Sequence, residues 1–469
     1  MVGTAPAVVI AAPASGSGKT TVSTGLIGAL RAAGHTVAPF KVGPDFIDPG
    51  YHAVAAGRPG RNLDPVLVGE DLIGPLYAHG SAGADIAVVE GVMGLFDGRI
   101  CDQMTGTPQG SAAQVASLLG APVVLVVDAR GQSQSIAALL HGFTTFDSAV
   151  HVAGVILNRV GSPRHEAVLR QACEHAGVAV LGAIPRADEL RVPSRHLGLI
   201  TAVEHGRQAR DAVAAMTELV GRHVDLAAVM SCASARVSAQ PWSPCVETPL
   251  PVAGAGDVTV ALASGKAFSF GYAEHAELLR GSGATVAEFD PLVDALPDGA
   301  DALVLPGGFP EQFTAELSAN GLVRQQIREL AERGAPIHAE CAGLTYLVDD
   351  LDGAPMCGVL RGSAKFTERL TLGYRDAVAV VDSSMHAAGE RVVGHEFHRT
   401  AVTFDDDLPP AWAFAGRGGA PARDGAVLRG VHAGYLHTHP AAHPHAIARF
   451  VSTAAAAQRT TGQRADGTN

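Results

Sequence analysis

The segment 7-AVVIAAPASGSGKTT-21 sets an apolar run directly before a glycine-rich turn, a lysine and two threonines. This order is typical of a strand, a phosphate-binding loop and a helix, because the loop's N–H groups and the helix N-terminus together face an anion. Lys19 would offset the phosphate charge and Thr20 would hold Mg²⁺. Pro13 replaces the first glycine of the longer motif, so only the short SGSGKT core is present. The alternative is a plain glycine-rich turn, but the preceding strand pattern favours a nucleotide site.

Short β-rich runs alternate with helical stretches through the N-terminal half. Fully apolar strands separated by helices predict a parallel sheet covered on both faces, which is a doubly wound α/β domain. The predicted strands are 7–11, 36–41, 85–90, 122–128, 152–157 and 178–184.

A second series of elements begins near residue 258. Its predicted elements are strands at 267–270, 285–289, 302–305 and 336–340, a helix at 273–282, hairpins after Cys341, a strand at 431–437 and a helix at 444–457. We expect two α/β domains, at 5–228 and 258–457, joined by a Ser-, Pro-, Ala- and Gly-rich linker at 229–257 and followed by a flexible tail at 458–469. The length of 469 residues suits such a division.

The composition is that of a packed globular protein. Hydrophobic residues make up 47% and charged residues 17% of the chain, and this balance excludes a disordered chain. The net charge of −12 and the scattered Lys and Arg residues argue against a nucleic-acid partner. Six cysteines without CxxC spacing indicate a reduced, cytoplasmic protein. No apolar run reaches the ~20 residues that span a bilayer, so we expect no membrane partner.

Charged side chains follow the second and third predicted strands. Lys41, Asp45 and Asp48 follow the second strand, and Glu90 ends the third. Because open α/β sheets bind ligands at the carboxyl ends of their strands, these groups should meet the phosphate-binding loop. The hard oxygen ligands of Thr20, Asp45 and Glu90 would suit an octahedral Mg²⁺. The alternative is that the aspartates cap turns and that Glu90 lies in an exposed loop.

A second signature, 338-HAECAG-343, follows another predicted strand. A cysteine at a strand-to-helix turn exposes its sulfur at a helix N-terminus, which lowers the pKa of a thiol. We therefore predict that Cys341 is a nucleophile, with a buried structural thiol as the alternative. Gly307 and Gly308, in a loop after an earlier strand, and Ala342 would donate backbone N–H groups to an oxyanion.

His437 is the predicted general base for Cys341, because it lies on a late strand. His439, two residues further and on the same face of that strand, is the alternative. The neighbouring histidines suggest zinc only weakly, because no cysteine spacing accompanies them. These histidines are His432, His437, His439, His443 and His445.

Eight motifs span nearly the whole chain: SGSGKTT, KVGPDFIDPGYH, VEGVMGLFDG, PGGFPE, AECAGLTYL, FTERLTLGYRDA, GHEFHRT and GYLHTH. Together they resemble the glutamine-dependent a,c-diamide synthases of cobalamin biosynthesis, which act on cobyrinic or hydrogenobyrinic acid. The resemblance implies an N-terminal domain similar to dethiobiotin synthetase and a C-terminal class I glutamine amidotransferase domain.

The resemblance implies that ATP phosphorylates the a and c acetate carboxylates of a corrinoid and that ammonia from L-glutamine then forms the amides. Asn158 is similar to an asparagine on the adenine side of the dethiobiotin synthetases, although an asparagine in a turn is the plainer interpretation. Lys41, Asp45 and Asp48 would contact the substrate, and Mg²⁺ would lie on the oxygen ligands predicted above. The ATP-binding residues would be Gly16, Ser17, Gly18, Lys19, Thr20, Thr21 and Asn158.

The resemblance leaves several alternatives open. Ordinary class I amidotransferases place a glutamate two residues after the base, but His439 stands there, so the third catalytic member is undetermined. An Ala-, Gly- and Arg-rich composition, typical of a GC-rich genome, favours the cobalt-free substrate over cobyrinic acid. Cobyric acid synthase and a P-loop ATPase switch with an inactive appendage are the rival functions. The order of the two amidations is open, and a homodimer is the default expectation.

Overall fold

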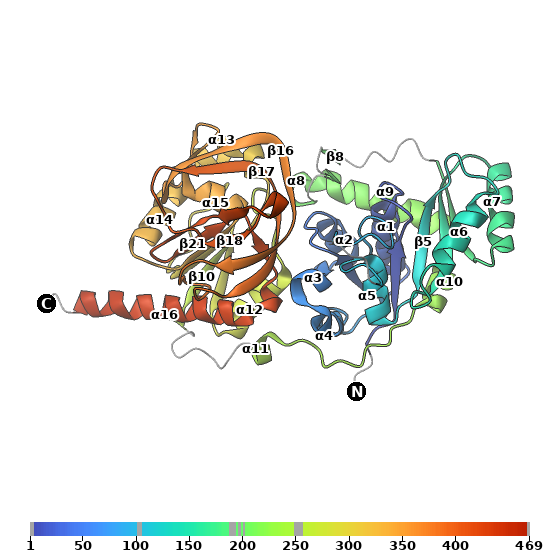
Figure 1. Cartoon of the computed structure of the whole chain (residues 1–469), viewed down its shortest axis with the longest axis horizontal. Helices are drawn as coiled ribbons and strands as arrows, with labels where there is room; N and C mark the ends of the chain where they lie inside the picture. Colours follow the sequence, from blue (N-terminus) through green and yellow to red (C-terminus); the bar gives the residue numbers. More distant parts are fainter. Residues whose placement is uncertain are drawn as a thin grey trace. The chain divides into compact units, whose positions relative to one another are not determined.

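The structure is a computed structural model that describes residues 4–100, 106–186, 194–195, 198–199, 202–247 and 257–466. It forms two compact units, Met1–Trp242 and Ser243–Asn469 (Figure 1). The division falls within the predicted linker, of which residues 248–256 lie outside the described part. Each unit is α/β, as the sequence predicted.

The first unit is built on a seven-stranded parallel sheet with the strand order β3-β2-β4-β1-β5-β6-β7. β4 and β5 lie on opposite sides of β1, so the loop after β1 opens where the strand order reverses, which is the usual ligand site of such sheets. The strands are β1 (Ala7–Ala11), β2 (Val37–Val42), β3 (Arg61–Leu63), β4 (Ile86–Glu90), β5 (Val123–Asp128), β6 (Val152–Val160) and β7 (Val180–Pro185).

Helices connect these strands and flank the sheet (Figure 1). All six predicted strands are present in this sheet, and its short strand β3, which has no apolar run, was not predicted. The helices are α1 (Lys19–Ala32), α2 (Asp48–Ala56), α3 (Pro65–Val68), α4 (Glu70–Gly80), α5 (Ala112–Leu119), α6 (Ile136–Thr145), α7 (Pro163–His175), α8 (Ala202–His205), α9 (Arg207–His223) and α10 (Leu226–Cys232), and a two-stranded ribbon joins β8 (Ser194–Arg195) to β9 (Gly198–Leu199).

The stretch expected to be linker is partly bound to the first unit. The backbone N–H of Ser234 donates to the carbonyl oxygen of Ala7 at 3.0 Å, and that of Trp242 donates to Pro75 at 2.9 Å. The indole of Trp242 is buried. Residues 229–242 therefore belong to the first unit, because backbone hydrogen bonds and one large apolar side chain hold them there.

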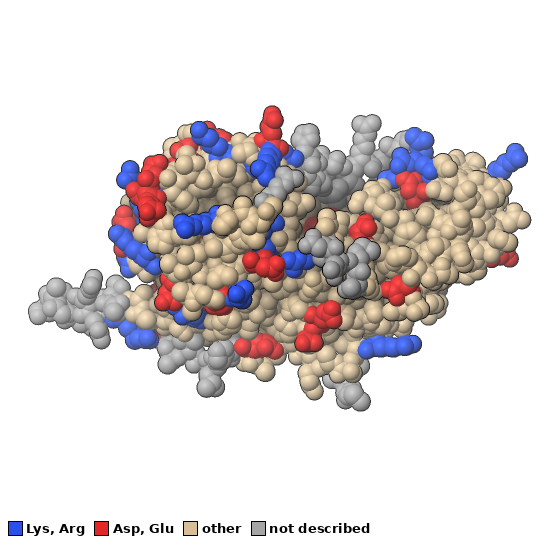
Figure 2. All heavy atoms as spheres, viewed as in Figure 1, with Lys and Arg blue, Asp and Glu red and all other residues tan. Residues whose placement is uncertain are grey.

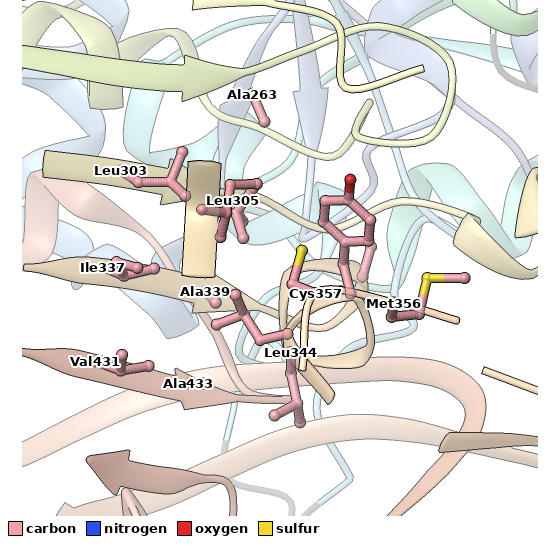
Figure 3. Packing of buried hydrophobic residues seen from close by; sticks show 14 of the residues in the cluster. Ala263, Leu303, Leu305, Ile337, Ala339, Leu344, Met356, Cys357, Val431 and Ala433 are labelled. Atoms are coloured by element: carbon pink, nitrogen blue, oxygen red, sulfur yellow. The ribbon is translucent and has the colours of Figure 1, made fainter. Parts of the chain in front are cut away.

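The second unit contains a six-stranded sheet in the order β11-β10-β12-β13-β21-β20, parallel except at the edge pair β20–β21. Leu303, Leu305 and Ile337 from the sheet pack with Leu344 in one buried core (Figure 3). The strands are β10 (Thr259–Ala263), β11 (Thr285–Phe289), β12 (Ala302–Leu305), β13 (Ile337–Glu340), β20 (Ala426–Leu428) and β21 (Val431–Gly434). β10 was not predicted, whereas the predicted strand at 267–270 makes only an isolated bridge.

A second sheet of this unit is built on a long antiparallel hairpin, which confirms the hairpins predicted after Cys341. Its strands are β14 (Val348–Leu351), β15 (Ala354–Pro355), β16 (Leu360–Ala379), β17 (Arg391–Phe404), β18 (Trp412–Ala415), β19 (Pro421–Asp424) and β22 (His437–Thr438). The strand predicted at 431–437 is therefore two strands in two sheets. The Asp424 carboxylate accepts the backbone N–H groups of Tyr435 at 2.8 Å and Leu436 at 3.1 Å, and these bonds end β21 and redirect the chain to β22.

The last helix is longer than predicted, because α16 extends to Asp466 and includes most of the segment expected to be a flexible tail; residues 467–469 lie outside the described part. The predicted helix at 273–282 is confirmed as α12. The helices of this unit are α11 (Pro244–Glu247), α12 (Ala273–Gly281), α13 (Thr314–Ala319), α14 (Gly321–Glu332), α15 (Ala342–Leu347) and α16 (Pro444–Asp466).

Among the described residues visible in Figure 2, Lys and Arg side chains are interspersed with Asp and Glu side chains, and they form no continuous basic stripe on either unit. Among the described residues, no helix combines the length and the apolar character needed to cross a membrane.

Candidate active sites

The phosphate-binding loop connects β1 to α1, which begins at Lys19. Gly18 has φ +97°, and a Cβ at this position would lie 2.2 Å from Nδ2 of Asn158. That Nδ2 atom donates to the carbonyl oxygen of Ser17 at 2.9 Å. Gly18 is therefore needed both for its left-handed backbone conformation and for the close approach of Asn158.

Residues of β5 and β6, on the side of β1 that faces away from β4, hold the phosphate-binding loop in place. Arg159 donates to the carbonyl oxygen of Gly16 at 2.9 Å and pairs with Asp128 at 2.5 Å. In the structure the amide of Asn158 binds the phosphate-binding loop itself, and its contact with adenine stays a prediction. The sequence analysis did not predict Arg159 and Asp128 as site residues. Both lie at the ends of strands, where ligand-site residues are expected.

Lys19 is buried beside the loop. Its ammonium group donates to the carbonyl oxygen of Met93, in the loop after β4, and lies 3.5 Å from the carbonyl oxygen of Ala14. Burial, and then the cation of Lys41, lowers the pKa of Lys19. A phosphate group bound at the loop would be an anionic partner for the Lys19 ammonium group and would favour its charged form. Thr21 follows in the first turn of α1 and is partly exposed.

A cluster of charged groups lies next to the loop, at the ends of β2 and β4. Thr20 Oγ1 is 2.7 Å from Glu90 Oε1 and 3.2 Å from Asp48 Oδ2. Lys41 Nζ is 2.6 Å from the same Asp48 oxygen and 3.0 Å from the same Glu90 oxygen. His52, one turn after Asp48 on α2, lies 2.7 Å from the other Glu90 oxygen. The spacing of four residues between Asp48 and His52 places both side chains on one face of α2, and this spacing is the sequence signal for His52.

Burial and mutual charge set the ionisation of this cluster. Burial alone would lower the pKa of Lys41, but Asp48 and Glu90 hold it above its ordinary value, so Lys41 is a cation. Burial would raise the pKa of Glu90, but Lys41 and the hydrogen bond from His52 hold it below its ordinary value. Burial and the neighbouring Asp45 raise the pKa of Asp48 to about 7. A further cation beside Asp48 would therefore favour its ionised form.

Asp45 takes a different position from the one predicted. Its Oδ1 atom accepts the backbone N–H groups of Ile47 at 2.7 Å and Asp48 at 3.1 Å, so it caps the turn before α2. Its other oxygen lies 3.9 Å from Lys41. The carboxylate that meets Thr20 and Glu90 is that of Asp48, because the turn capped by Asp45 places Asp48 at the first residue of α2, facing the sheet edge.

Cys341 occupies the sharp turn between β13 and α15 that its sequence context predicted. Its backbone angles, φ +51° and ψ −98°, are unusual for a non-glycine residue. Its backbone N–H donates to Gly434 at 2.8 Å, and its thiol lies 3.7 Å from the carbonyl oxygen of Phe397 on β17. Strain at a single residue is typical of functional turns, because the surrounding sheet holds it in place.

Backbone donors surround the sulfur of Cys341. The turn predicted an exposed sulfur with a lowered pKa, but Cys341 is buried. Burial and then Glu311 raise the pKa of this thiol, while hydrogen bonds from the backbone N–H groups of Gly308 and Ala342 oppose the rise. These two donors are among the three predicted for an oxyanion. A Cβ on Gly307 would lie 2.3 Å from Cε1 of His437, so the loop and the imidazole are in close contact.

β17 and Phe270 connect His437 to the surroundings of Cys341. His437 pairs with His395 of β17, two residues from Phe397, whose carbonyl oxygen contacts the thiol. The ring of Phe270 is 6.4 Å from that of His437 and 6.1 Å from that of Phe397. The alternative base, His439, instead accepts the backbone N–H of Ala441 at 3.3 Å through Nδ1.

Glu340 lies beside His437 and is the candidate for the third catalytic member, which the sequence left undetermined. Its Oε2 is 3.5 Å from Nδ1 of His437, and its Oε1 is 3.3 Å from Nε2 of His338. Thr438 donates to Oε1 through both its backbone N–H and its hydroxyl at 3.1 Å. Burial would raise the pKa of Glu340, but hydrogen bonds from His338 and His437 hold it well below its ordinary value, so it is an anion.

Two family models match the chain: a CobQ/CobB/MinD/ParA nucleotide binding domain over residues 8–200 and a CobB/CobQ-like glutamine amidotransferase domain over residues 259–445. The hydrogenobyrinate a,c-diamide synthase of Mycobacterium tuberculosis is 71% identical over 96% of this chain and 98% of that relative. That of Streptomyces coelicolor is 53% identical over 95% and 97%. The cobyrinate a,c-diamide synthase of a Synechococcus species is 39% identical over 95% and 97%.

A P-loop nucleotide site and a cysteine amidotransferase site on one chain define a glutamine-hydrolysing, amide-forming ligase that uses ATP. The relatives cover almost all of the chain at high identity, so the family is settled. The chain belongs to the hydrogenobyrinate a,c-diamide synthase family.

Proposed function

We propose that the protein converts the a and c acetate carboxylates of hydrogenobyrinic acid into amides, with ATP as the energy source and glutamine as the nitrogen donor. The observation that carries this proposal is the 71% identity, over 96% of the chain, to a synthase named for this substrate. The relative named for the cobalt-containing substrate is 39% identical, so cobyrinic acid is the second candidate.

In the first unit, we propose that a substrate carboxylate oxygen attacks the γ-phosphorus of ATP and that ADP leaves. The acyl phosphate formed in this way is then attacked by ammonia, and phosphate leaves as the amide forms. Lys19 and the loop N–H groups would stabilise the charge that develops on the transferred phosphoryl group. Lys41 is a buried cation between Asp48 and Glu90, and it would hold the incoming carboxylate or phosphate oxygen.

The oxygens of Thr20, Asp48 and Glu90 fit Mg²⁺, because hard oxygen ligands converge here next to the phosphate-binding loop. In this proposal the third ligand is Asp48 and not Asp45, which the sequence predicted, because Asp48 is the aspartate that contacts Thr20. When bound, Mg²⁺ would neutralise charge on the phosphate oxygens.

In the second unit, we propose that the Cys341 thiol gives its proton to His437 and attacks the side-chain amide carbon of glutamine. The N–H groups of Gly308 and Ala342 would stabilise the oxyanion. His437 would pass the proton to the leaving ammonia, and water would then hydrolyse the thioester to glutamate. Glu340 would orient His437 and stabilise its cationic form, as the carboxylate of a Ser-His-Asp triad does.

A reduced, cytoplasmic setting suits this chemistry. The cysteines of the described residues are free thiols, which supports a reducing compartment, and the nucleophilic thiol needs one.

Mass spectrometry of the products tests the substrate assignment. The protein is incubated with ATP, Mg²⁺ and glutamine, and with either hydrogenobyrinic acid or cobyrinic acid. We expect a diamide, and faster conversion of the cobalt-free acid. Faster conversion of cobyrinic acid would transfer the assignment to the cobalt-containing substrate. Four amides in place of two would identify a cobyric acid synthase.

A further inference from the structure

Three side chains of the second unit bring metal-binding atoms together at a place that neither proposed reaction uses. His386 and Glu390 lie between β16 and β17, and His445 lies at the start of α16. Glu390 Oε1 is 2.9 Å from Nδ1 of His386 and 2.6 Å from Nε2 of His445. The three ligand atoms lie within 4.8 Å of one another, and no other trio of His, Cys, Asp or Glu in the described ranges does so.

The imidazole of His386 is buried, and its Nδ1 atom makes no hydrogen bond of good geometry. It is 2% exposed, and its ring centre lies 5.0 Å from that of Trp412 and 5.7 Å from that of His432. Although Glu390 Oε1 is 2.9 Å away, the Nδ1 atom has no partner in hydrogen-bond geometry. A buried polar atom without a partner is unfavourable. One Glu390 oxygen, Oε1, thus lies within 3 Å of a nitrogen atom from each of the two histidines, so a single ion placed among these atoms would contact all three side chains.

Neighbouring hydrogen bonds orient the ligands. Ser383 Oγ accepts the backbone N–H of His386 at 3.0 Å, which fixes the turn that carries this histidine. Glu390 Oε2 accepts the backbone N–H of Ala387 at 3.2 Å, so its other oxygen faces the histidines. Arg449 of α16 donates to the carbonyl oxygen of Ser383 at 2.9 Å and holds the helix against the segment. Supporting bonds of this kind are what metal ligands require.

We propose that His386, Glu390 and His445 bind one Zn²⁺ ion, which ties the segment before β17 to the start of α16. Two imidazoles and one carboxylate are a favoured zinc ligand set, and a water molecule would complete the tetrahedron. The side chain of His445 is 56% exposed and that of Glu390 is 20% exposed, so this position is open to solvent. The proposal does not depend on the proposed function.

Equilibrium dialysis with Zn²⁺ alone, followed by metal analysis, tests this site. The full chain carries Cys341→Ala throughout, so that the reactive thiol cannot bind the metal. We expect one tightly bound Zn²⁺ per chain and at least tenfold weaker binding in His445→Ala and Glu390→Gln. His175→Ala removes an exposed histidine of the first unit and serves as the matched control, which should bind Zn²⁺ as before. Equal binding by the parent and by the doubly substituted His445→Ala/Glu390→Gln chain would overturn the proposal.

Two further readouts keep the test independent of variant stability. In a Trp242→Phe background, which leaves Trp412 as the one tryptophan, Zn²⁺ should raise the melting temperature reported by fluorescence in the parent, but not in Glu390→Gln. Co²⁺ should give visible d–d bands without a thiolate charge-transfer band. A thiolate band would place the metal on a cysteine and refute the site. If His386, Glu390 and His445 form only a metal-free hydrogen-bond network, neither the rise in melting temperature nor the d–d bands would appear, and the proposal would be wrong.

Discussion

Glu340 shows at the scale of one residue how the amidotransferase site is completed. The carboxylate that faces His437 comes from the residue before the nucleophile, not from a position after the histidine. Parallel pairing of β13 with β21 makes this possible, because it aligns Glu340 with Gly434 and so brings the end of β13 next to the strand that leads to His437. No spacing rule in the sequence pointed to this carboxylate.

We expect Glu340→Gln to lower kcat for glutamine hydrolysis on the order of 100-fold, because the neutral amide no longer stabilises the imidazolium. The KM for glutamine should change little, and amidation with added ammonia should stay near the wild-type rate. Thr438→Val is the matched control, since it removes one neutral hydrogen bond to the same carboxylate. Undiminished glutaminase activity in Glu340→Gln would mean that Glu340 does not contribute and that the site is a Cys–His dyad.

Gly18 and Gly16 allow a paired test of the phosphate-binding loop. Both have positive φ, but an added Cβ would strike Asn158 at Gly18 and would meet nothing within 4 Å at Gly16. The backbone strain should be similar at the two positions, about 1–2 kcal/mol. We therefore expect Gly18→Ala to weaken ATP binding, measured by calorimetry, at least tenfold more than Gly16→Ala does. Similar affinities in the two variants would mean that Asn158 does not need this close approach.

At the scale of elements, the break between β21 and β22 positions His437, the proposed base. The apolar run at 431–437 predicted one strand, but Asp424 ends β21 and the chain enters a second sheet. The central parallel strands of the first unit followed their apolar runs closely, because each run is buried on both faces of the sheet. The Asp424 carboxylate comes from another strand, so the local pattern at 431–437 could not reveal the break.

The ionisation of Asp424 makes this break sensitive to pH. Burial raises the pKa of Asp424 to about 6, above its value of 3.8 in an unfolded chain. The folded unit therefore holds this proton more tightly, and the resulting stabilisation is present below pH 3.8 and is lost as the pH rises through 6. Asp424→Asn cannot titrate, so its stability relative to wild type should increase between pH 4 and pH 7, by at most about 3 kcal/mol.

Urea unfolding followed through Trp412 checks this expectation. The chain has two tryptophans, one in each unit, so a Trp242→Phe background isolates the signal of the second unit. Asp424→Asn also replaces one acceptor oxygen of the side chain by an N–H donor. The stability lost with that hydrogen bond is the same at every pH. A stability difference that is constant from pH 4 to pH 7 would contradict the assigned direction.

At the scale of the whole molecule, the two reactions belong to two separately packed units. Lys19→Ala should abolish amide formation from either glutamine or ammonia, because the phosphoryl group is no longer stabilised, while a basal glutaminase activity remains. Cys341→Ala should abolish glutamine use but keep ammonia-dependent amidation. Product masses and glutamate release measure the two activities. If Cys341→Ala still released glutamate, another residue of the chain would be the nucleophile.

The sequence alone determined the two α/β units, the phosphate-binding loop and the turn that carries Cys341, because each depends on residues that are neighbours in the chain: an apolar strand, a tight turn and a helix start. Tertiary structure decided which distant groups complete each site. It selected Asp48 over Asp45 beside Thr20, turned Asn158 onto the loop and brought Glu340 to His437. These choices depend on strand order, on a capped turn and on a strand broken by a remote carboxylate, and no local spacing encodes any of them.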